Sequence, residues 1–222
     1  MKNTITAKYL LNRIMVVIPC VLTAQGVVCQ LKASAELKGS GDIANGVNVI
    51  NSVNEAFAEV VKVPDAIVIL NISKSSSQLS NEIAFINWCQ TVQPRTVIVA
   101  YVQNHELSII NYISALGVRV IISQYETASI FTDLIIKSFS ATTMLYSPII
   151  KNILSSRVSA ELTACEVQVL GQLFLGNNVS QVAQRLGRDI RTVSAHKRHA
   201  MEKLGLRCEK DLYVLGCALS GK

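Results

Sequence analysis

Five short runs rich in β-branched residues recur along the first 140 residues, and a stretch of helical character follows each of them. Strand-sized apolar runs that alternate with helices predict βα units and therefore a parallel sheet. Each run is apolar at successive positions, which is typical of strands that helices cover on both faces. We therefore expect a three-layer α/β domain over residues 1–140, with a five-stranded parallel sheet formed by RIMVVI (13–18), GVNVI (46–50), DAIVILN (65–71), TVIVAYV (96–102) and VRVIIS (118–123).

Helical stretches occupy the segments between and after these strands. Their apolar residues recur with helical spacing, and the connections to the strands are short. The expected helices lie at about Val21–Leu37, Val53–Val61, Asn81–Cys89, Glu106–Leu116 and Ala128–Phe139.

The N-terminal segment allows a second interpretation, because several cations precede its apolar run, as they do in a secretory signal peptide. Pro19, Thr23 and Gln25 interrupt that run, which makes it too broken for a membrane span. We favour a buried strand that leads into an amphipathic helix. This interpretation predicts a cytoplasmic protein without a membrane segment.

Residues 141–158 break the alternation of strands and helices. The segment is rich in Ser and Thr and contains Pro148, so we expect a linker with one short helix near Ile149–Leu154. No strand pattern follows it. Residues 159–222 are therefore expected to form a second, all-α domain of four helices.

Start and stop signals divide this second domain into its helices. Thr163 with Glu166, and Asn178 with Gln181, have the spacing of capping boxes at the starts of two helices. Gly187 closes the second helix after about two turns. Two short helices joined by a tight turn with Gly predict a helix-turn-helix, whose second helix enters the DNA major groove.

The third helix is expected at about Ile190–Leu204, with Asp189 as its cap, and a fourth at about Glu209–Leu219. On a period of 3.6 residues, Val193, Ala200 and Leu204 share one face, which would pack against the preceding helices. The outer surface and its flanks would then present Arg191, Ser194, Ala195, His196, Lys197 and Arg198.

Charge supports this division of the chain. Residues 1–150 hold 10 Lys and Arg against 9 Asp and Glu, whereas residues 151–222 hold 11 against 6, so five of the six net positive charges lie in the C-terminal third. A local excess of cations is expected where a surface meets a polyanion, although a basic domain without such a partner has the same excess.

Residues Leu162–Leu206 resemble the LuxR-type (GerE) helix-turn-helix domain, the family whose pattern these residues follow at many fixed spacings. The matching residues are Leu162-Thr163, Glu166, Leu170, Gly176, Ala183, Leu186, Thr192-Val193, His196 and Lys203-Leu204. The sequence departs from the pattern at Ala164-Cys165, where proline-arginine is usual, and at Ala200, where isoleucine is usual. These departures concern packing more than DNA contact.

The resemblance implies roles for the residues of the third helix. Ser194, Ala195 and Arg198 match positions that read bases, whereas Thr192, His196 and Lys197 match the side that contacts the DNA backbone. We add Arg191 and Lys203 to the candidate DNA-binding residues, although a lysine at position 203 also suits the end of a helix electrostatically. A bidentate contact between the Arg198 guanidinium and a guanine edge favours the correct base over a wrong one by about 1–3 kcal/mol.

Five βα units followed by this domain resemble a two-domain response regulator, whose receiver domain accepts a phosphoryl group on an aspartate. Such chemistry needs acidic residues and a metal ion at the strand ends, and a lysine after the fifth strand. Here the corresponding strand ends hold Ile18-Pro19-Cys20, Asn71, Ala100-Tyr101 and Ser123. We expect a receiver-like domain without phosphoryl chemistry; a different α/β domain is the alternative.

The sequence also resembles the accessory members of the capsule- and fimbria-controlling branch of this family, which pair with a fuller relative. It therefore predicts a transcription regulator that binds promoter DNA as a homodimer or as a heterodimer with a related response regulator, independently of phosphorylation. RNA polymerase is a further candidate partner. The alternative is an adaptor that modulates another regulator by pairing with it.

An enzyme is the least favoured class. The sequence has no glycine loop for phosphates and no Ser/His/Asp or Cys/His set, so we expect no catalysis and no cofactor. Its six cysteines are scattered, without C-x-x-C or histidine at zinc spacing, and therefore predict no metal site.

Overall fold

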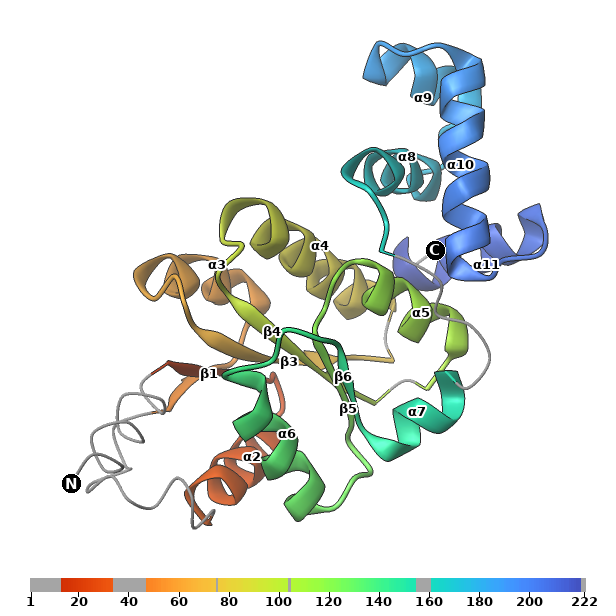
Figure 1. Ribbon diagram of the computed structural model, residues 1–222. Coiled ribbons are helices and arrows are strands. Elements are labelled where there is room, and N and C mark those ends of the chain that lie inside the picture. Colours follow the sequence, from red (N-terminus) through yellow and green to blue (C-terminus); the bar gives the residue numbers. More distant parts are fainter. Residues whose placement is uncertain (1–12, 34–46, 75, 104, 155–160, 221–222) are drawn as a thin grey trace.

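The computed structural model describes residues 13–33, 47–74, 76–103, 105–154 and 161–220. It contains a parallel sheet with strands in the order β2-β1-β3-β4-β5-β6 (Figure 1). The strands are β1 (Ile14–Val17), β2 (Asn48–Ile50), β3 (Ile67–Ile72), β4 (Val97–Val102), β5 (Val120–Ser123) and β6 (Leu145–Tyr146). This is the doubly wound arrangement, in which the strand order reverses between β1 and β3.

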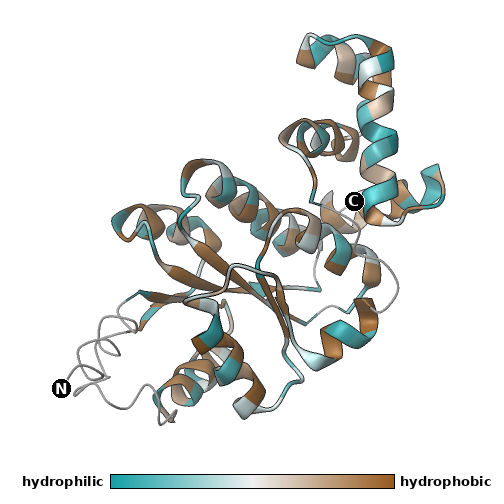
Figure 2. Ribbon diagram, in the orientation of Figure 1, coloured by the Kyte–Doolittle hydropathy of each residue, from teal (hydrophilic) through white to brown (hydrophobic). Residues whose placement is uncertain are grey.

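The register of the sheet explains why the strand sequences are apolar throughout. Val16, Ile69, Val99 and Val120 lie side by side on neighbouring strands and point into one core. The row that begins at Val17, one residue later, points into the other core. Successive side chains of a strand point to opposite faces, and both faces are covered, so both must be apolar. Figure 2 shows these strands in the colour of hydrophobic residues.

Helices cover both faces of the sheet. On one face lie α2 (Val21–Ala33) and α6 (Ala128–Ser138), which contact each other. On the other face lie α3 (Val53–Lys62), α4 (Ser76–Val92) and α5 (Leu107–Ala115). Each predicted helix is present among the described residues and in the expected order, although α4 begins five residues earlier than expected. The predicted extension of the first helix to Leu37 lies outside the described residues.

The segment expected to be a linker contributes to the sheet domain, which makes the expected five-stranded sheet six-stranded. Leu145–Tyr146 pairs with β5 as β6, and α7 (Pro148–Leu154) packs against β5 and α5. A two-residue strand has no alternation that a sequence pattern could reveal. Its structure depends instead on pairing with the edge of β5.

The C-terminal part contains the four expected helices. These are α8 (Ala164–Phe174), α9 (Val179–Leu186), α10 (Ile190–Leu204) and α11 (Glu209–Ser220). Both predicted capping boxes form: the Thr163 side chain accepts from the Glu166 amide, and the Asn178 side chain accepts from the Gln181 amide. Local sequence signals therefore fix the starts of α8 and α9.

The helical part packs directly on the sheet domain through α11 and the C-terminal end of α10. One apolar cluster runs from α4 and α5 into α8, α10 and α11. The ring centroids of Tyr112 on α5 and Phe174 on α8 are 5.9 Å apart. Asn111 donates a hydrogen bond from Nδ2 to the Leu204 carbonyl at 3.2 Å, and the Leu162 amide donates to the Ala115 carbonyl at 2.7 Å.

Candidate nucleic-acid interface

A three-residue turn connects α9 to α10. Gly187 adopts a left-handed conformation (φ 61°) that ends α9, and its amide donates back to α9 carbonyls. Asp189 then caps α10, because its carboxylate accepts the Arg191 amide at 2.7 Å. Glycine accommodates the left-handed conformation without the penalty that a Cβ brings. The turn sets the angle between α9 and α10.

One edge of α10 anchors the helix. Val193, Ala200 and Leu204 are at most 1% exposed. Val193 packs in a small core with residues of α8 and α9, and the other two side chains belong to the cluster shared with the sheet domain. The predicted buried face of this helix is confirmed.

The opposite edge of α10 carries the arginines. Arg191 and Arg198 are exposed, and both lie on the face opposite to Val193. Within the described residues, no carboxylate forms a salt bridge with either guanidinium. Both positive charges are therefore available to a partner.

The remaining candidate side chains of the N-terminal half of α10 lie around this edge. Thr192 is exposed, whereas Ser194, Ala195 and His196 are half-buried. A small side chain at two successive positions keeps the backbone of α10 close to whatever surface approaches it. The structure thus brings these candidate residues together with the two arginines on about two turns of α10.

Lys197 is already engaged within the protein. Its ammonium lies 2.6 Å from Oε1 and 2.5 Å from Oε2 of Glu209, the first residue of α11. The lysine side chain is 16% exposed, and that of Glu209 is 74% exposed. The sequence spacing between the two residues did not indicate this ion pair, because only the turn after α10 brings them together.

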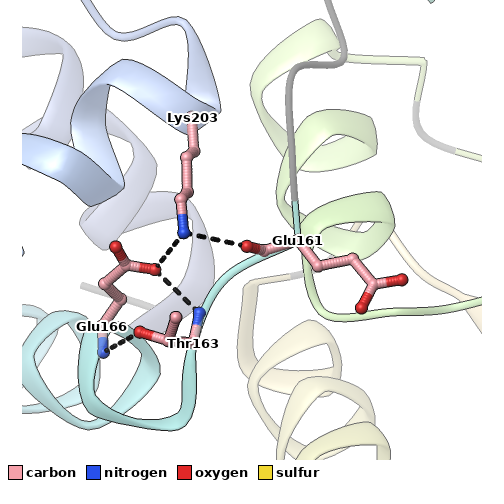
Figure 3. A network of polar contacts seen from close by, with 4 residues as sticks. All are labelled: Glu161, Thr163, Glu166 and Lys203. Atoms are coloured by element: carbon pink, nitrogen blue, oxygen red, sulfur yellow. Dashed lines mark hydrogen bonds and ion pairs between the residues drawn. The ribbon is translucent and has the colours of Figure 1, made fainter.

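Lys203, another of the predicted DNA contacts, is engaged in the packing of α10 on α8. Its ammonium lies 2.7 Å from Oε2 of Glu166 and 3.0 Å from the carbonyl of Glu161 (Figure 3). The same Glu166 oxygen accepts the Thr163 amide at 2.7 Å. A DNA phosphate would have to compete with these partners for the Lys203 ammonium.

The pKa of Glu166 reflects this network. Burial by itself would raise the pKa of this carboxyl, which is 3% exposed, but the hydrogen bonds from Lys203 and Thr163 outweigh burial. The pKa is therefore lowered, and Glu166 is charged at neutral pH. A charged Glu166 with a charged Lys203 joins the start of α8 to the end of α10.

Two arginines that the sequence analysis did not select lie near the turn. Arg185 on α9 and Arg188 in the turn are exposed, with hydrogen bonds of 3.4 Å to Gln172 and Cys165 respectively. The first helix of a helix-turn-helix crosses the DNA backbone, so cations here suit phosphate contacts. Their position within one turn of Gly187 was the signal that would have identified them.

The carboxyl edge of the sheet is the place where a receiver domain carries its chemistry. Here Gln124, which follows β5, donates from Nε2 to Oδ1 of Asn71 at 2.7 Å, and Asn71 donates to the Ser73 hydroxyl at 2.9 Å. Two neutral amides thus contact each other above β3 and β5. The pocket at this edge has no carboxylate among its lining residues, Ile18, Pro19, Cys20, Thr23, Asn71, Ser73, Lys74, Gln78, Gln103 and Gln124.

One buried acid lies beside this pocket. Glu82 on α4 is 1% exposed and accepts hydrogen bonds from the amide and hydroxyl of Ser73 at 2.8 and 2.6 Å. Burial raises the pKa of Glu82, against the hydrogen bonds from Ser73 and Asn71. This carboxyl orders the loop after β3. The hydroxyl of Ser123, at the end of β5, forms a hydrogen bond with Nε2 of His105 at 2.9 Å.

The described residues contain neither a candidate membrane span nor a candidate metal site. No helix among them is long and apolar enough to cross a bilayer. They also contain no group of three or more His, Cys, Asp or Glu side chains with the arrangement of a metal site.

Comparison with known proteins places the C-terminal part in a family. Residues 160–215 match the model of the bacterial regulatory proteins of the luxR family. No curated protein matches the sequence.

Solved structures resemble nearly the whole chain. The two-component response regulator RcsB in complex with DNA has a TM-score of 0.56 at 18% identity, covering 93% of this chain and 98% of that chain. A structure of two RcsB dimers bound to two parallel DNAs has a TM-score of 0.55 with the same identity and coverage. RcsB from Salmonella enterica serovar Typhimurium, bound to the promoter rprA with phosphomimetic BeF3-, has a TM-score of 0.52 at 18% identity, covering 91% and 96%.

At this level of identity the likeness concerns the fold, and it extends over both parts of the chain. Residues 160–215 thus carry a LuxR-type helix-turn-helix domain, joined to an α/β domain that shares the fold of a response regulator.

Proposed function

We propose that this protein is a transcription regulator that binds double-stranded promoter DNA through α10, as a homodimer or heterodimer, and that aspartyl phosphorylation does not control it. The observation that carries the proposal is the two-sided α10: Val193, Ala200 and Leu204 are buried, while Arg191 and Arg198 are exposed and have no salt bridge to a described acid. Such a regulator works in the cytoplasm.

The dimensions of α10 suit this role. A major groove about 12 Å wide accepts one α-helix. Ser194 and Ala195 lie between the two arginines and let the helix backbone approach the base edges. Arg198 has the planar fork that pairs with a guanine edge. Thr192, His196 and Lys197 would then face the sugar-phosphate backbone.

The packing of the domains supports the same role. Residues 1–140, extended by β6 and α7, and residues 159–222 are proposed as the two domains, and their contact involves α11 and the C-terminal end of α10. Arg191 lies in the first turn of α10 and Arg198 just past its midpoint, and the N-terminal half of the helix extends away from the sheet domain (Figure 1). DNA therefore has access to this face while the two domains are docked.

A gel-shift titration with promoter and random duplexes tests the proposal. Arg198→Ala is expected to lower the preference for promoter over random DNA by about tenfold, because a bidentate contact contributes about 1–3 kcal/mol. Arg95→Ala, which removes an exposed arginine from the sheet domain, is the matched control and should bind like the parent. If the parent and Arg198→Ala show the same preference for promoter over random DNA, α10 is not part of the surface that recognises the promoter.

Independence from phosphorylation has its own test. The neutral pair Asn71–Gln124 lies at the strand ends where a receiver holds its aspartate and lysine. An amide cannot accept a phosphoryl group from a phosphodonor. We therefore expect acetyl phosphate with Mg²⁺ to change neither the mass of the protein nor its affinity for DNA. A mass increase of one phosphoryl group would contradict this part of the proposal.

The second candidate function is an adaptor that pairs with another regulator. The exposed apolar side chains at the start of α2, Val21 at 59% and Leu22 at 84%, favour a protein contact. A related response regulator is the expected partner, and RNA polymerase is a further one. When Arg191 and Arg198 are replaced by Ala, an adaptor still binds its partner and still changes gene expression. A DNA-binding regulator with the same replacements no longer binds its promoter.

A further inference from the structure

We propose that Glu209 restrains DNA binding by competing with phosphate for the ammonium of Lys197. This inference rests on the proposed function. It assigns Glu209 a regulatory part in the DNA-binding surface, although the residue lies on α11 and outside the helix-turn-helix itself.

The contact geometry supports competition with a phosphate. Both carboxylate oxygens of Glu209 lie within 2.6 Å of the Lys197 ammonium. A DNA phosphate would likewise present two anionic oxygens to this group. Glu209 therefore occupies, within the free protein, the same donor sites that a phosphate needs.

The position of Lys197 supports a phosphate as the competitor. Lys197 directly precedes Arg198 and lies one turn after Ser194, on the flank between the buried and exposed faces of α10. When a helix lies in the major groove, its flanks are the parts nearest to the two sugar-phosphate strands. A lysine on this flank contacts phosphates once its stem turns outward.

The exposure of Glu209 allows a DNA phosphate to take its place beside Lys197. The Glu209 side chain is 74% exposed, so water already screens its attraction to Lys197. Ion pairs of this kind are weak, whereas a lysine that neutralises a phosphate also releases counterions from DNA. DNA can therefore displace Glu209, but the freed carboxylate stays close and repels the incoming phosphate. The affinity of the parent protein for DNA is therefore lower than it would be without the Glu209 carboxylate.

The pair also joins α10 to α11, and a purely structural role predicts different results. If Glu209 only fastened the two helices, its removal would loosen α10 and weaken DNA binding. If it competes with phosphate, its removal strengthens DNA binding and increases the number of ions released. The dependence of affinity on salt separates the two roles, because loosening a helix adds no phosphate contact.

The experiment compares the full-length parent, Glu209→Gln and Glu161→Gln on a random-sequence duplex over a series of salt concentrations. Glu161→Gln removes an exposed carboxylate of the same domain and has the same net charge as Glu209→Gln, so it reports general electrostatics. We expect Glu209→Gln to bind about two- to fivefold more tightly than Glu161→Gln at low salt. Its plot of log affinity against log salt should steepen by up to about 0.9, which corresponds to one phosphate contact.

A second background tests whether Glu209 acts through Lys197. In Lys197→Ala, the further change Glu209→Gln should alter the affinity and the salt slope no more than the further change Glu161→Gln does. The inference is overturned if Glu209→Gln binds no more tightly than Glu161→Gln, or if its advantage over Glu161→Gln persists in Lys197→Ala. Either result, with DNA binding by the parent intact, leaves the proposed function standing. A parent that binds no DNA overturns both.

Discussion

The ammonium of Lys203 lies 2.7 Å from Glu166, whereas the guanidinium of Arg198 is exposed and forms no salt bridge with a described acid. Both residues belong to the same helix, and both were predicted from the sequence to contact DNA. Their surroundings separate them: Lys203 lies on the flank that meets α8, and Arg198 lies on the free edge. A cation whose charge the fold leaves unmatched can bind DNA without first losing a partner within the protein.

Glu166→Gln is expected to lower the free energy of unfolding at neutral pH by about 1–3 kcal/mol, because the partly buried Lys203 loses its charged partner. The pKa of Glu166 is lowered in the folded state, so this contribution is present above the ordinary glutamate pKa and is lost as pH falls through the lowered value. The difference between parent and variant should therefore shrink in acid.

Urea unfolding at neutral pH and near pH 4 measures that difference. Glu161→Gln is the control, because its carboxylate is turned away from Lys203 and only its main-chain carbonyl takes part (Figure 3). An unchanged difference between parent and Glu166→Gln at both pH values would contradict the assignment of charge to Glu166.

At the scale of helices, two glycines with the same local conformation have opposite surroundings. Gly171 in α8 has no atom within 4 Å of the place where a Cβ would lie, whereas a Cβ on Gly216 in α11 would meet Cδ1 of Phe174 at 2.8 Å. Gly216 therefore lets α11 approach α8 closely. Helix propensity by itself would favour alanine at both positions.

Gly171→Ala should therefore stabilise the protein by up to about 1 kcal/mol. Gly216→Ala should destabilise it by about 1–3 kcal/mol, because the Phe174 ring must move within a packed cluster. Thermal unfolding of the two variants beside the parent measures both effects. Stabilisation by Gly216→Ala would mean that the ring has free space to move into.

At the scale of the whole molecule, the two domains share one core. The apolar cluster that begins on the sheet continues through Tyr112 and Phe174 to Leu215 and Leu219 of α11. Domains that share buried surface of this kind cannot lose it independently. The contact fixes the direction of α10 relative to the sheet domain while the arginine edge stays exposed.

We expect calorimetry of the parent to show a single unfolding transition, because the helical domain and the sheet domain stabilise each other. Phe174→Ala should weaken the contact and separate the helical domain as an earlier transition, since loss of a packed aromatic ring costs several kcal/mol. Leu22→Ala, an exposed position on α2, is the control and should retain the single transition. Two transitions in the parent would show that the contact is weak.

The sequence by itself determined the elements and their chemistry. Alternating β-branched runs predicted the parallel sheet, and the capping residues Thr163, Asn178 and Asp189 predicted where the helices begin. Such signals are local, because a cap or an apolar period acts within one or two turns of chain. The apolar period of α10 is local in the same way, so the sequence was sufficient to predict the arginine edge of this helix.

Only the tertiary structure decided which charges are matched. The pairs Lys197–Glu209 and Lys203–Glu166 join residues 12 and 37 positions apart, and Gln124 reaches Asn71 across 53 positions. The strand β6 likewise exists because β5 offers it a partner. Contacts between distant residues depend on how elements pack, and no local period encodes them. They distinguish Arg191 and Arg198, which form no salt bridge with a described acid, from Lys197 and Lys203, which are paired within the protein.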